Sequence, residues 1–280
     1  MSQDLRKYYG NLSLIPQTEG YSFLELIAPS VNIHESMLVD LPLYLRKVDL
    51  SNNSITSAES LVVLQSLIYL SIHHNVLTDF PLNNMSPNLR FLDLSHNQLS
   101  SFLASSPSLE VLDLSNNVLS SFEASYCPNL KKISLSHNPL STVSLSDLPI
   151  LEELDLSNTE VTSLPIIPRS VTKLKAQNCQ SISDLSTLAD VISLKSLDLS
   201  GSSITLDTLK PIKSLKNLNE IFVADTELAS DRVGIIVLCP SIILIDREKV
   251  TRDEVMEAFE MRREMDQKEH ENEEKSEDDE

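Results

Sequence analysis

The sequence predicts an α/β solenoid, a curved horseshoe of short stacked units, and two observations support that fold class. The pattern L-x-x-L-x-L-x-x-N-x-L, clearest in residues 89–102, returns at intervals of 20 to 24 residues over most of the chain. Hydrophobic residues make up 41% of the chain but aromatic residues only 5%, which is typical of a core of leucine layers. We therefore expect a parallel β-sheet on the concave face and extended or 3₁₀ segments on the convex face.

Each unit is predicted to contain one short strand whose successive side chains point to opposite faces of the sheet. Positions four and six point inward, whereas positions three, five and seven point outward on the concave face. A single unit cannot bury its own leucines, so residues 45–241 are predicted to form one continuous stack of about nine units. These units start at Leu45, Leu67, Leu89, Leu109, Leu130, Leu151, Val171, Leu194 and Leu218, and a truncated copy starts at Ile242.

Position nine predicts a structural ladder of asparagines through the first half of the stack. An amide side chain supplies two donors and an acceptor to turn backbone that is otherwise buried without partners. Thr159, Cys179, Ser202 and Thr226 occupy the same position later, and each has less hydrogen-bonding capacity. The second half is therefore expected to be less regular than the half that contains Asn53, Asn75, Asn97, Asn117 and Asn138.

These repeats resemble those of intracellular leucine-rich repeat proteins with short units, and the chain is similar to the regulatory subunit of protein phosphatase one. The resemblance covers about residues 45–250. It implies the horseshoe fold. For function it implies only that a regulatory subunit of a protein phosphatase is one possible role, because binding sites are grafted onto folds.

The two ends of the chain depart from the repeat. Residues 1–44 lack a clean unit, and Pro29 falls where the inward sixth residue should be, so we expect an N-terminal cap. Residues 242–268 are predicted to form a C-terminal cap and a short helix that opens with a capping box between Thr251 and Glu254. Residues 269–280 contain eight acids, one lysine and no apolar residue, which predicts a disordered acidic tail.

The short C-terminal helix is predicted to have one partly apolar face. Val255, Ala258, Phe259 and Met265 form this face. We expect it to cover the last leucine layer, and the alternative is a helix that binds a partner.

The convex segments are expected to change character along the chain. Prolines lie two residues before a new unit at Pro87, Pro107, Pro128 and Pro149, which favours extended or turn backbone. From Leu185 onward apolar residues recur every three positions, which predicts 3₁₀ turns or short helices. One further column, which contains Phe80, Phe102 and Phe122, predicts an internal aromatic spine rather than a ligand-binding box.

The net charge narrows the classes of possible partner, and the cysteines indicate the cellular compartment. The net charge of −19 opposes binding to nucleic-acid backbones, and the mixed basic residues do not favour an anionic membrane surface. No signal peptide or membrane-spanning stretch is predicted. Because the three cysteines are odd in number and widely spaced, we expect a reducing intracellular compartment, either cytoplasm or nucleus. The chain is also expected to be a monomer.

The sequence contains no convincing catalytic, cofactor or metal site, so we do not expect an enzyme. His74, His96 and His137 share position eight, but the last lies two units beyond the second, and no Cys or carboxylate completes a compact set. Aspartates recur at position five, but L-D-L-S is the pattern of the repeat itself, and the open face offers no pocket to shift their pKa.

An apolar island among charges is the best candidate for a binding site. Tyr69, Phe91 and Val111 occupy position three of neighbouring units, where other units carry mainly lysine and glutamate. Interface hot spots favour aromatic residues within a polar rim, which here is predicted to comprise His73, Arg90, Asp93 and Asp113. Ile68 is predicted to belong to the same partner-binding site. We therefore expect a protein-interaction scaffold that binds a partner on its concave face. The alternatives are the phosphatase subunit and an acidic chaperone for basic proteins such as histones.

Overall fold

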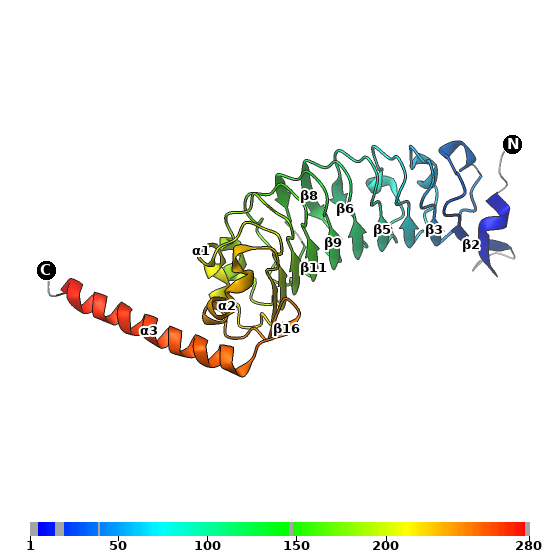
Figure 1. The fold of residues 1–280 in the computed structure, drawn as a ribbon. Coiled ribbons are helices and arrows are strands. Elements are labelled where there is room, and N and C mark those ends of the chain that lie inside the picture. Colours follow the sequence, from blue (N-terminus) through cyan, green and yellow to red (C-terminus); the bar gives the residue numbers. More distant parts are fainter. Residues whose placement is uncertain (1–4, 15–19, 39, 146–147, 278–280) are drawn as a thin grey trace.

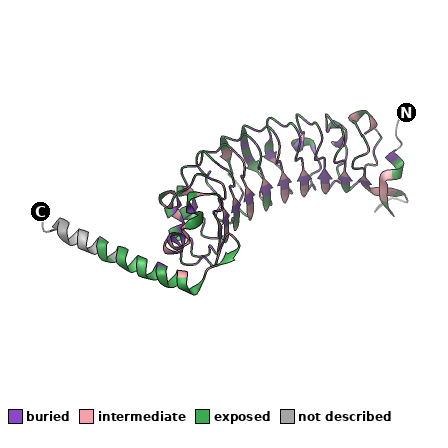
Figure 2. Ribbon diagram, viewed as in Figure 1, coloured by how far each residue is buried: buried purple, intermediate pink, exposed green. Residues whose placement is uncertain are grey.

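The chain forms one curved solenoid whose short strands line the concave face (Figure 1). This computed structural model describes all residues except 1–4, 15–19, 39, 146–147 and 278–280. Buried side chains follow the interior from one end of the solenoid to the other (Figure 2). The predicted fold class, a leucine-rich repeat solenoid with a mostly parallel sheet, is confirmed.

The concave sheet contains 13 strands within the described residues. Its central strands are parallel and in register, so that Leu70 lies beside Leu92, and Leu92 beside Leu112. Only the outermost pairs, β1 with β2 and β15 with β16, are antiparallel. In spatial order the strands are β1 (Tyr9–Leu14), β2 (Tyr21–Ile27), β3 (Lys47–Asp49), β4 (Tyr69–Ser71), β5 (Phe91–Asp93), β7 (Val111–Asp113), β9 (Lys132–Ser134), β11 (Glu153–Asp155), β12 (Lys173–Lys175), β13 (Ser196–Asp198), β14 (Glu220–Phe222), β15 (Leu244–Ile245) and β16 (Glu248–Lys249).

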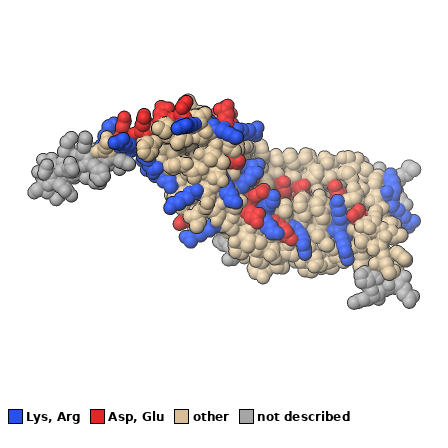
Figure 3. All heavy atoms as spheres, turned by 90° about the horizontal axis from the view of Figure 1, so that it is seen from below, with Lys and Arg blue, Asp and Glu red and all other residues tan. Residues whose placement is uncertain are grey.

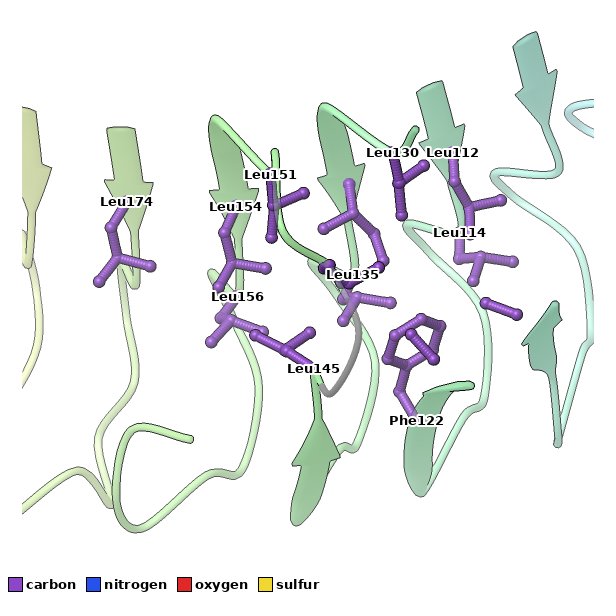
Figure 4. Close-up of a cluster of buried hydrophobic side chains, with 14 of the residues drawn as sticks. Leu112, Leu114, Phe122, Leu130, Leu135, Leu145, Leu151, Leu154, Leu156 and Leu174 are labelled. Atoms are coloured by element: carbon purple, nitrogen blue, oxygen red, sulfur yellow. The ribbon is translucent and has the colours of Figure 1, made fainter. Parts of the chain in front are cut away.

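The core consists of side chains that point inward from the concave strands and from the convex segments opposite them. In Figure 4, Leu135 lies on the concave side of this interior, and Phe122 and Leu145 reach toward it from the convex side. Phe80 and Phe102 stack with ring centroids 6.4 Å apart, and Phe122 is buried in the same column. The predicted aromatic column is therefore internal.

The asparagines join each unit to the one before it. The Asn97 amide nitrogen donates to the Leu94 carbonyl of its own turn at 3.0 Å and to the Ile72 carbonyl of the previous unit at 3.1 Å. Its oxygen accepts the backbone N–H of Leu77 at 3.0 Å. Asn75, Asn117 and Asn138 repeat this pattern, and Asn53 makes its counterpart with the first unit.

The later residues at position nine make fewer hydrogen bonds. The Thr159 hydroxyl donates to the Leu156 carbonyl at 2.7 Å, and Ser202 donates to Ala176 while it accepts from the backbone of Cys179. A hydroxyl has one donor where an amide has two, so each of these side chains donates to fewer backbone carbonyls than an asparagine does.

The convex side also differs between the two halves. In the first half β6 (Leu103–Ser105), β8 (Ser121–Tyr126) and β10 (Thr142–Ser144) form a second, parallel sheet that the sequence analysis does not anticipate. In the second half 3₁₀ and α segments replace it, as the three-residue spacing predicts. The helical segments before the C-terminal helix are η1 (Leu5–Tyr8), η2 (Glu35–Met37), η3 (Glu59–Leu61), η4 (Leu82–Asn84), η5 (Ser186–Asp190), α1 (Leu206–Leu209), η6 (Lys210–Ser214), η7 (Glu227–Ser230) and α2 (Arg232–Leu238).

The solenoid begins one unit earlier than the sequence predicts. Strand β2 is parallel to β3, and Leu26 aligns with the inward Val48. Position six of this first unit is the buried Ala28, whose N–H donates to the Asp49 carbonyl at 2.8 Å. Pro29 therefore lies one residue beyond the position assigned to it and removes no ladder hydrogen bond. Within residues 1–44, the β1–β2 hairpin closes the end of the sheet.

The C-terminal helix, α3 (Arg252–Glu277), is longer than predicted and extends away from the solenoid (Figure 1). Ala258 is buried, but Val255, Phe259 and Met265 are exposed, so only the first turns of the helix cover the end of the stack. The expectation that the whole apolar face docks there is wrong. None of the helices in the described part of the chain is both long and apolar enough to span a membrane.

The predicted tail boundary at Glu269 is not a break in the backbone, because α3 continues through Glu277. Glutamate and lysine, which make up most of residues 269–277, favour helix, and this outweighs the lack of apolar residues that suggested disorder. Residues 278–280 of the predicted tail lie outside the described residues.

Arg232 fixes the root of α3. Its Nε donates to Glu254 at 2.5 Å, and its other nitrogens donate to the carbonyls of Ile245 and Lys249. Glu254 also accepts the Thr251 N–H at 2.7 Å, which forms the predicted capping box. The hydrogen bond from Arg232 lowers the pKa of Glu254 to about 2.

Candidate partner-binding face

Tyr69, Phe91 and Val111 form one continuous strip, which we call the aromatic strip. They are register neighbours on β4, β5 and β7. The Tyr69 and Phe91 rings stack with centroids 4.3 Å apart and planes 4° from parallel. Lys47 covers the end of the strip, with its ammonium nitrogen 5.2 Å from the Tyr69 ring centroid. The structure thus brings together the three apolar residues predicted to centre the site.

Position two provides one edge of this strip. Ile68 is 37% exposed and adds apolar surface beside Tyr69. Arg90 is not a free cation, because its guanidinium lies 3.4 Å from Glu110, which also binds Lys131 at 2.9 Å. The hydrogen bond from Lys131 lowers the pKa of Glu110. The sequence analysis includes Ile68 and Arg90 but not Glu110 and Lys131, the next residues at position two, so this chain of ion pairs was missed.

Position five provides the opposite edge. One carboxylate oxygen of Asp93 accepts the Ser95 N–H at 3.0 Å and the Ser95 hydroxyl at 2.7 Å. Asp113 accepts the Ser115 N–H at 2.9 Å in the same way, so the D-x-S pattern fixes the carboxylates locally. Burial raises the pKa of Asp113, and the charge of Asp93 contributes to the shift.

The carboxylates at position five also act on the aromatic strip. Burial raises the pKa of the Tyr69 phenol, and the charges of Asp49 and Asp93 raise it further. Both carboxylates therefore lie close enough to Tyr69 to disfavour its ionised form. The strip combines apolar surface with a negative potential along one edge.

The predicted rim residue His73 belongs to a histidine cluster where β4 ends. Its Nδ1 lies 2.8 Å from Nδ1 of His74, which stacks on His96 with centroids 3.8 Å apart. Partial desolvation lowers the pKa of His74, and the neighbouring His96 and His73 lower it further. His137 instead lies 3.2 Å from the Asn158 amide. Among the described residues no group of three His, Cys, Asp or Glu side chains is arranged to hold a metal ion.

Backbone conformation explains why histidine recurs at position eight. His74, His96 and His137 have φ values of 52°, 53° and 55°, in the left-handed region. Asn, Asp and His tolerate this region better than most residues, and glycine tolerates it best. Gly201, with φ of 67°, takes the same place in a later unit. The histidine column therefore has a conformational cause that requires no ligand.

The rest of the concave face is dominated by ion pairs. Lys132 contacts Glu153 at 2.8 Å, and Lys175 lies 3.7 Å from Asp155. A shallow groove of about 160 Å³ runs between these side chains and Val111. Figure 3 shows lysines, arginines and carboxylates intermixed over this face.

A larger hollow lies on the convex side. It has a volume of about 920 Å³ between β10 and residues 166–170, and its lining includes Tyr126, Val143 and Ile166. Sequence reasoning missed this hollow because it forms where Pro165 and Pro168 interrupt the convex pattern. Residues 146–147 lie outside the described residues.

Comparisons with known proteins agree with the repeat assignment. A family model for leucine-rich repeats in two copies matches residues 87–127, and a model for a single leucine-rich repeat matches residues 129–149. No curated protein sequence matches the chain closely enough to count as a relative.

Three solved structures share the solenoid. The APL1 leucine-rich repeat domain has a TM-score of 0.64 at 22% identity, covering 80% of this chain and 61% of that chain. For the leucine-rich effector YopM from Yersinia pestis the TM-score is 0.59 at 21% identity, covering 80% and 66%. For TLR13 in its complex with ssRNA13 the values are 0.57 and 20%, covering 85% and 40%.

The chain therefore spans less than two thirds of the length of each of these structures. At such low identity they establish a common fold and not a common activity. Together with the chain's own repeats and the two matching models, they show a leucine-rich repeat solenoid fold.

Proposed function

We propose that the protein is a non-enzymatic scaffold that binds a protein partner on its concave face, with the aromatic strip at the centre of the interface. The stacked Tyr69 and Phe91 rings carry this proposal. They are half-buried on strands that are hydrogen-bonded on both sides, so their positions are fixed before binding. A preorganised aromatic surface loses little conformational entropy on association.

The surroundings of the strip support the same role. Ile68 extends the apolar surface, whereas Asp93, Asp113, Arg90 and His73 surround it with polar groups. Interfaces commonly combine an aromatic centre with a polar rim that excludes water. Leucine-rich repeat domains commonly mediate protein–protein interaction, and the scaffold proposal specifies where this one does so.

The predicted alternatives have less support. The similarity to the regulatory subunit of protein phosphatase one is not confirmed by the comparisons. A chaperone for basic proteins rests on the acidic end of the chain, which includes residues outside the described part. The three cysteines are buried and unpaired, which supports placing the scaffold in a reducing intracellular compartment.

The central experiment removes the aromatic strip by the double substitution Tyr69→Ala and Phe91→Ala. Partners captured from the native organism by the wild-type chain are identified by mass spectrometry, and the affinity of each purified partner is then measured. We expect the double variant to remain folded and to lose at least about 2 kcal/mol of binding free energy, because both rings are hot-spot residues.

The matched control removes apolar surface from the convex side, through Leu103→Ala and Tyr126→Ala. These residues are 49% and 57% exposed, so their removal tests whether any exposed apolar surface suffices. Wild-type affinity in the control and loss in the strip variant support the proposal. A folded strip variant that binds with wild-type affinity refutes it.

A further inference from the structure

The chemistry of the partner can be inferred from a difference between carboxylates on the same column. Asp93, Asp113, Asp155 and Asp198 all use one oxygen to accept the N–H of the serine two residues later. Each carboxylate therefore has a second oxygen that does not hold this turn and can make another contact. What each second oxygen contacts separates the two halves of the face.

In the second half, neighbouring side chains of the same face contact these second oxygens. Lys175 lies 3.7 Å from the second oxygen of Asp155. The Gln177 amide donates to the second oxygen of Asp198 at 2.5 Å. These two carboxylates are internally satisfied and leave little for a partner to bind.

Asp93 and Asp113, beside the aromatic strip, have no such cationic neighbour in the described part of the chain. Among the described residues no lysine or arginine lies within 4.0 Å of Asp93 or Asp113, although Glu110 on the other edge has two such neighbours. Asp93 and Asp113 are register partners on β5 and β7, about 4.8 Å apart along the sheet. Two half-buried carboxylates thus face the same space without a cation.

The stacked rings constrain what can neutralise these carboxylates. The strip lies two residues before the carboxylates on the same strands, about 6–7 Å away. A partner that covers the rings with an apolar side chain therefore places its neighbouring residue over Asp93 and Asp113. Arginine fits best, because its planar guanidinium can donate to two carboxylates at once and is more weakly hydrated than an ammonium group.

We propose that the concave face recognises a protein segment in which an arginine adjoins a bulky apolar side chain, with the arginine bound by Asp93 and Asp113 and the apolar side chain resting on Tyr69 and Phe91. This inference rests on the proposed concave binding role and specifies its partner chemistry. A segment with a glutamate in place of the arginine adds a third negative charge and is rejected.

The test uses three fluorescent peptides and the full-length chain. The first is fluorescein-SGRFLGS-amide, the second replaces its arginine with glutamate, and the third replaces its phenylalanine and leucine with serines. Fluorescence polarisation is measured against the wild-type chain. We expect the arginine peptide to bind at least tenfold more tightly than either of the others.

Two double variants separate the two proposals. Asp93→Asn with Asp113→Asn keeps the oxygen that accepts the serine N–H, so the fold is retained and only the negative charges are lost. This variant is expected to bind the arginine peptide at least tenfold more weakly. The matched control, Asp155→Asn with Asp198→Asn, removes the same charge from the same column and is expected to retain wild-type binding.

The possible failures have different meanings. If Tyr69→Ala with Phe91→Ala weakens binding but the Asp93 and Asp113 variant does not, the concave site stands and the arginine inference is wrong. Equal weakening by both aspartate variants reduces the effect to general charge attraction and also overturns the inference. If none of the peptides binds, or if binding survives loss of the rings, the arginine inference is wrong, and the partner-capture experiment with Tyr69→Ala and Phe91→Ala separately decides the proposed function.

Discussion

The two halves of the solenoid form the same backbone arc with different side chains. In the first half each asparagine bridges two units through both ends of its amide, and the convex side contains the three strands β6, β8 and β10 after the short segments η3 and η4. In the second half Thr159, Cys179 and Ser202 take that place, and 3₁₀ turns cover the convex side. The comparison teaches that the inward leucines define the repeat, whereas the turn and the convex segment can be built in more than one way.

The concave surfaces of the two halves differ just as clearly. Around the aromatic strip the chain leaves rings and carboxylates available to a partner. From Lys132 onward several of its charges are paired internally, as in the contacts of Lys132 with Glu153 and of Lys175 with Asp155. Exposed ion pairs contribute little to stability, so their main effect is to occupy surface that an incoming charge would otherwise bind.

The largest expected effect tests the difference between the two kinds of turn. We expect Asn97→Ala to lower the free energy of unfolding by about 1–3 kcal/mol, because it leaves carbonyls and an N–H of two units without partners. Thr159→Val removes a single hydroxyl donor and should cost about 0.5–1.5 kcal/mol. Urea denaturation of both variants measures these values. Equal losses would show that the amide is not what distinguishes the halves.

The next prediction concerns how the second half is closed. Glu254→Gln removes the charge that Arg232 binds and should destabilise the protein by about 1–3 kcal/mol at pH 7. The folded pKa of about 2 lies below the ordinary glutamate pKa of 4.5, so this stabilisation is present above pH 4.5 and is lost as the pH falls toward 2. The difference between wild type and variant should therefore shrink in urea denaturation at pH 3. A difference that is independent of pH would argue against the ion pair.

The smallest expected effect sharpens the view of the histidine cluster. His96→Asn keeps a residue that tolerates positive φ but removes the ring stacked on His74. The pKa of His74 should rise, because both part of its desolvation and one like charge disappear. Nuclear magnetic resonance titration of the imidazole protons measures this shift. His137→Asn, which alters a residue outside the cluster, should leave it unchanged, and the same response to both variants would refute the local cause.

Much of this architecture follows from the sequence because the leucine period is strong. The frame of the first unit was missed because Ala28 fills the place of a large aliphatic residue. The convex sheet was missed because Leu103 and Ala104 show no alternation long enough to mark a strand. The length of α3 was missed because the lack of apolar residues after Glu269 was given more weight than the helix propensity of its glutamates and lysine.

The candidate site was partly accessible from the sequence for the same reason. The period aligns Tyr69, Phe91 and Val111, so their juxtaposition could be predicted without coordinates. The pairing of Arg90 with Glu110 and the second oxygens of the aspartates could not be, because they depend on side-chain conformation. The position of a residue in the repeat predicts which residues lie beside it, whereas its hydrogen bonds and ion pairs are known only from the structure.

The hydrogen bonds of the asparagines connect only adjacent units, and this makes the concave face modular. Excision of one whole unit, residues 89–108, would bring the Leu77 N–H to Asn117 instead of Asn97 and would place Tyr69 directly beside Val111. The backbone joint would be chemically unchanged, but the order of outward side chains would be new. Such a chain can acquire a different binding surface by losing, duplicating or exchanging single units, without redesign of the core that supports them.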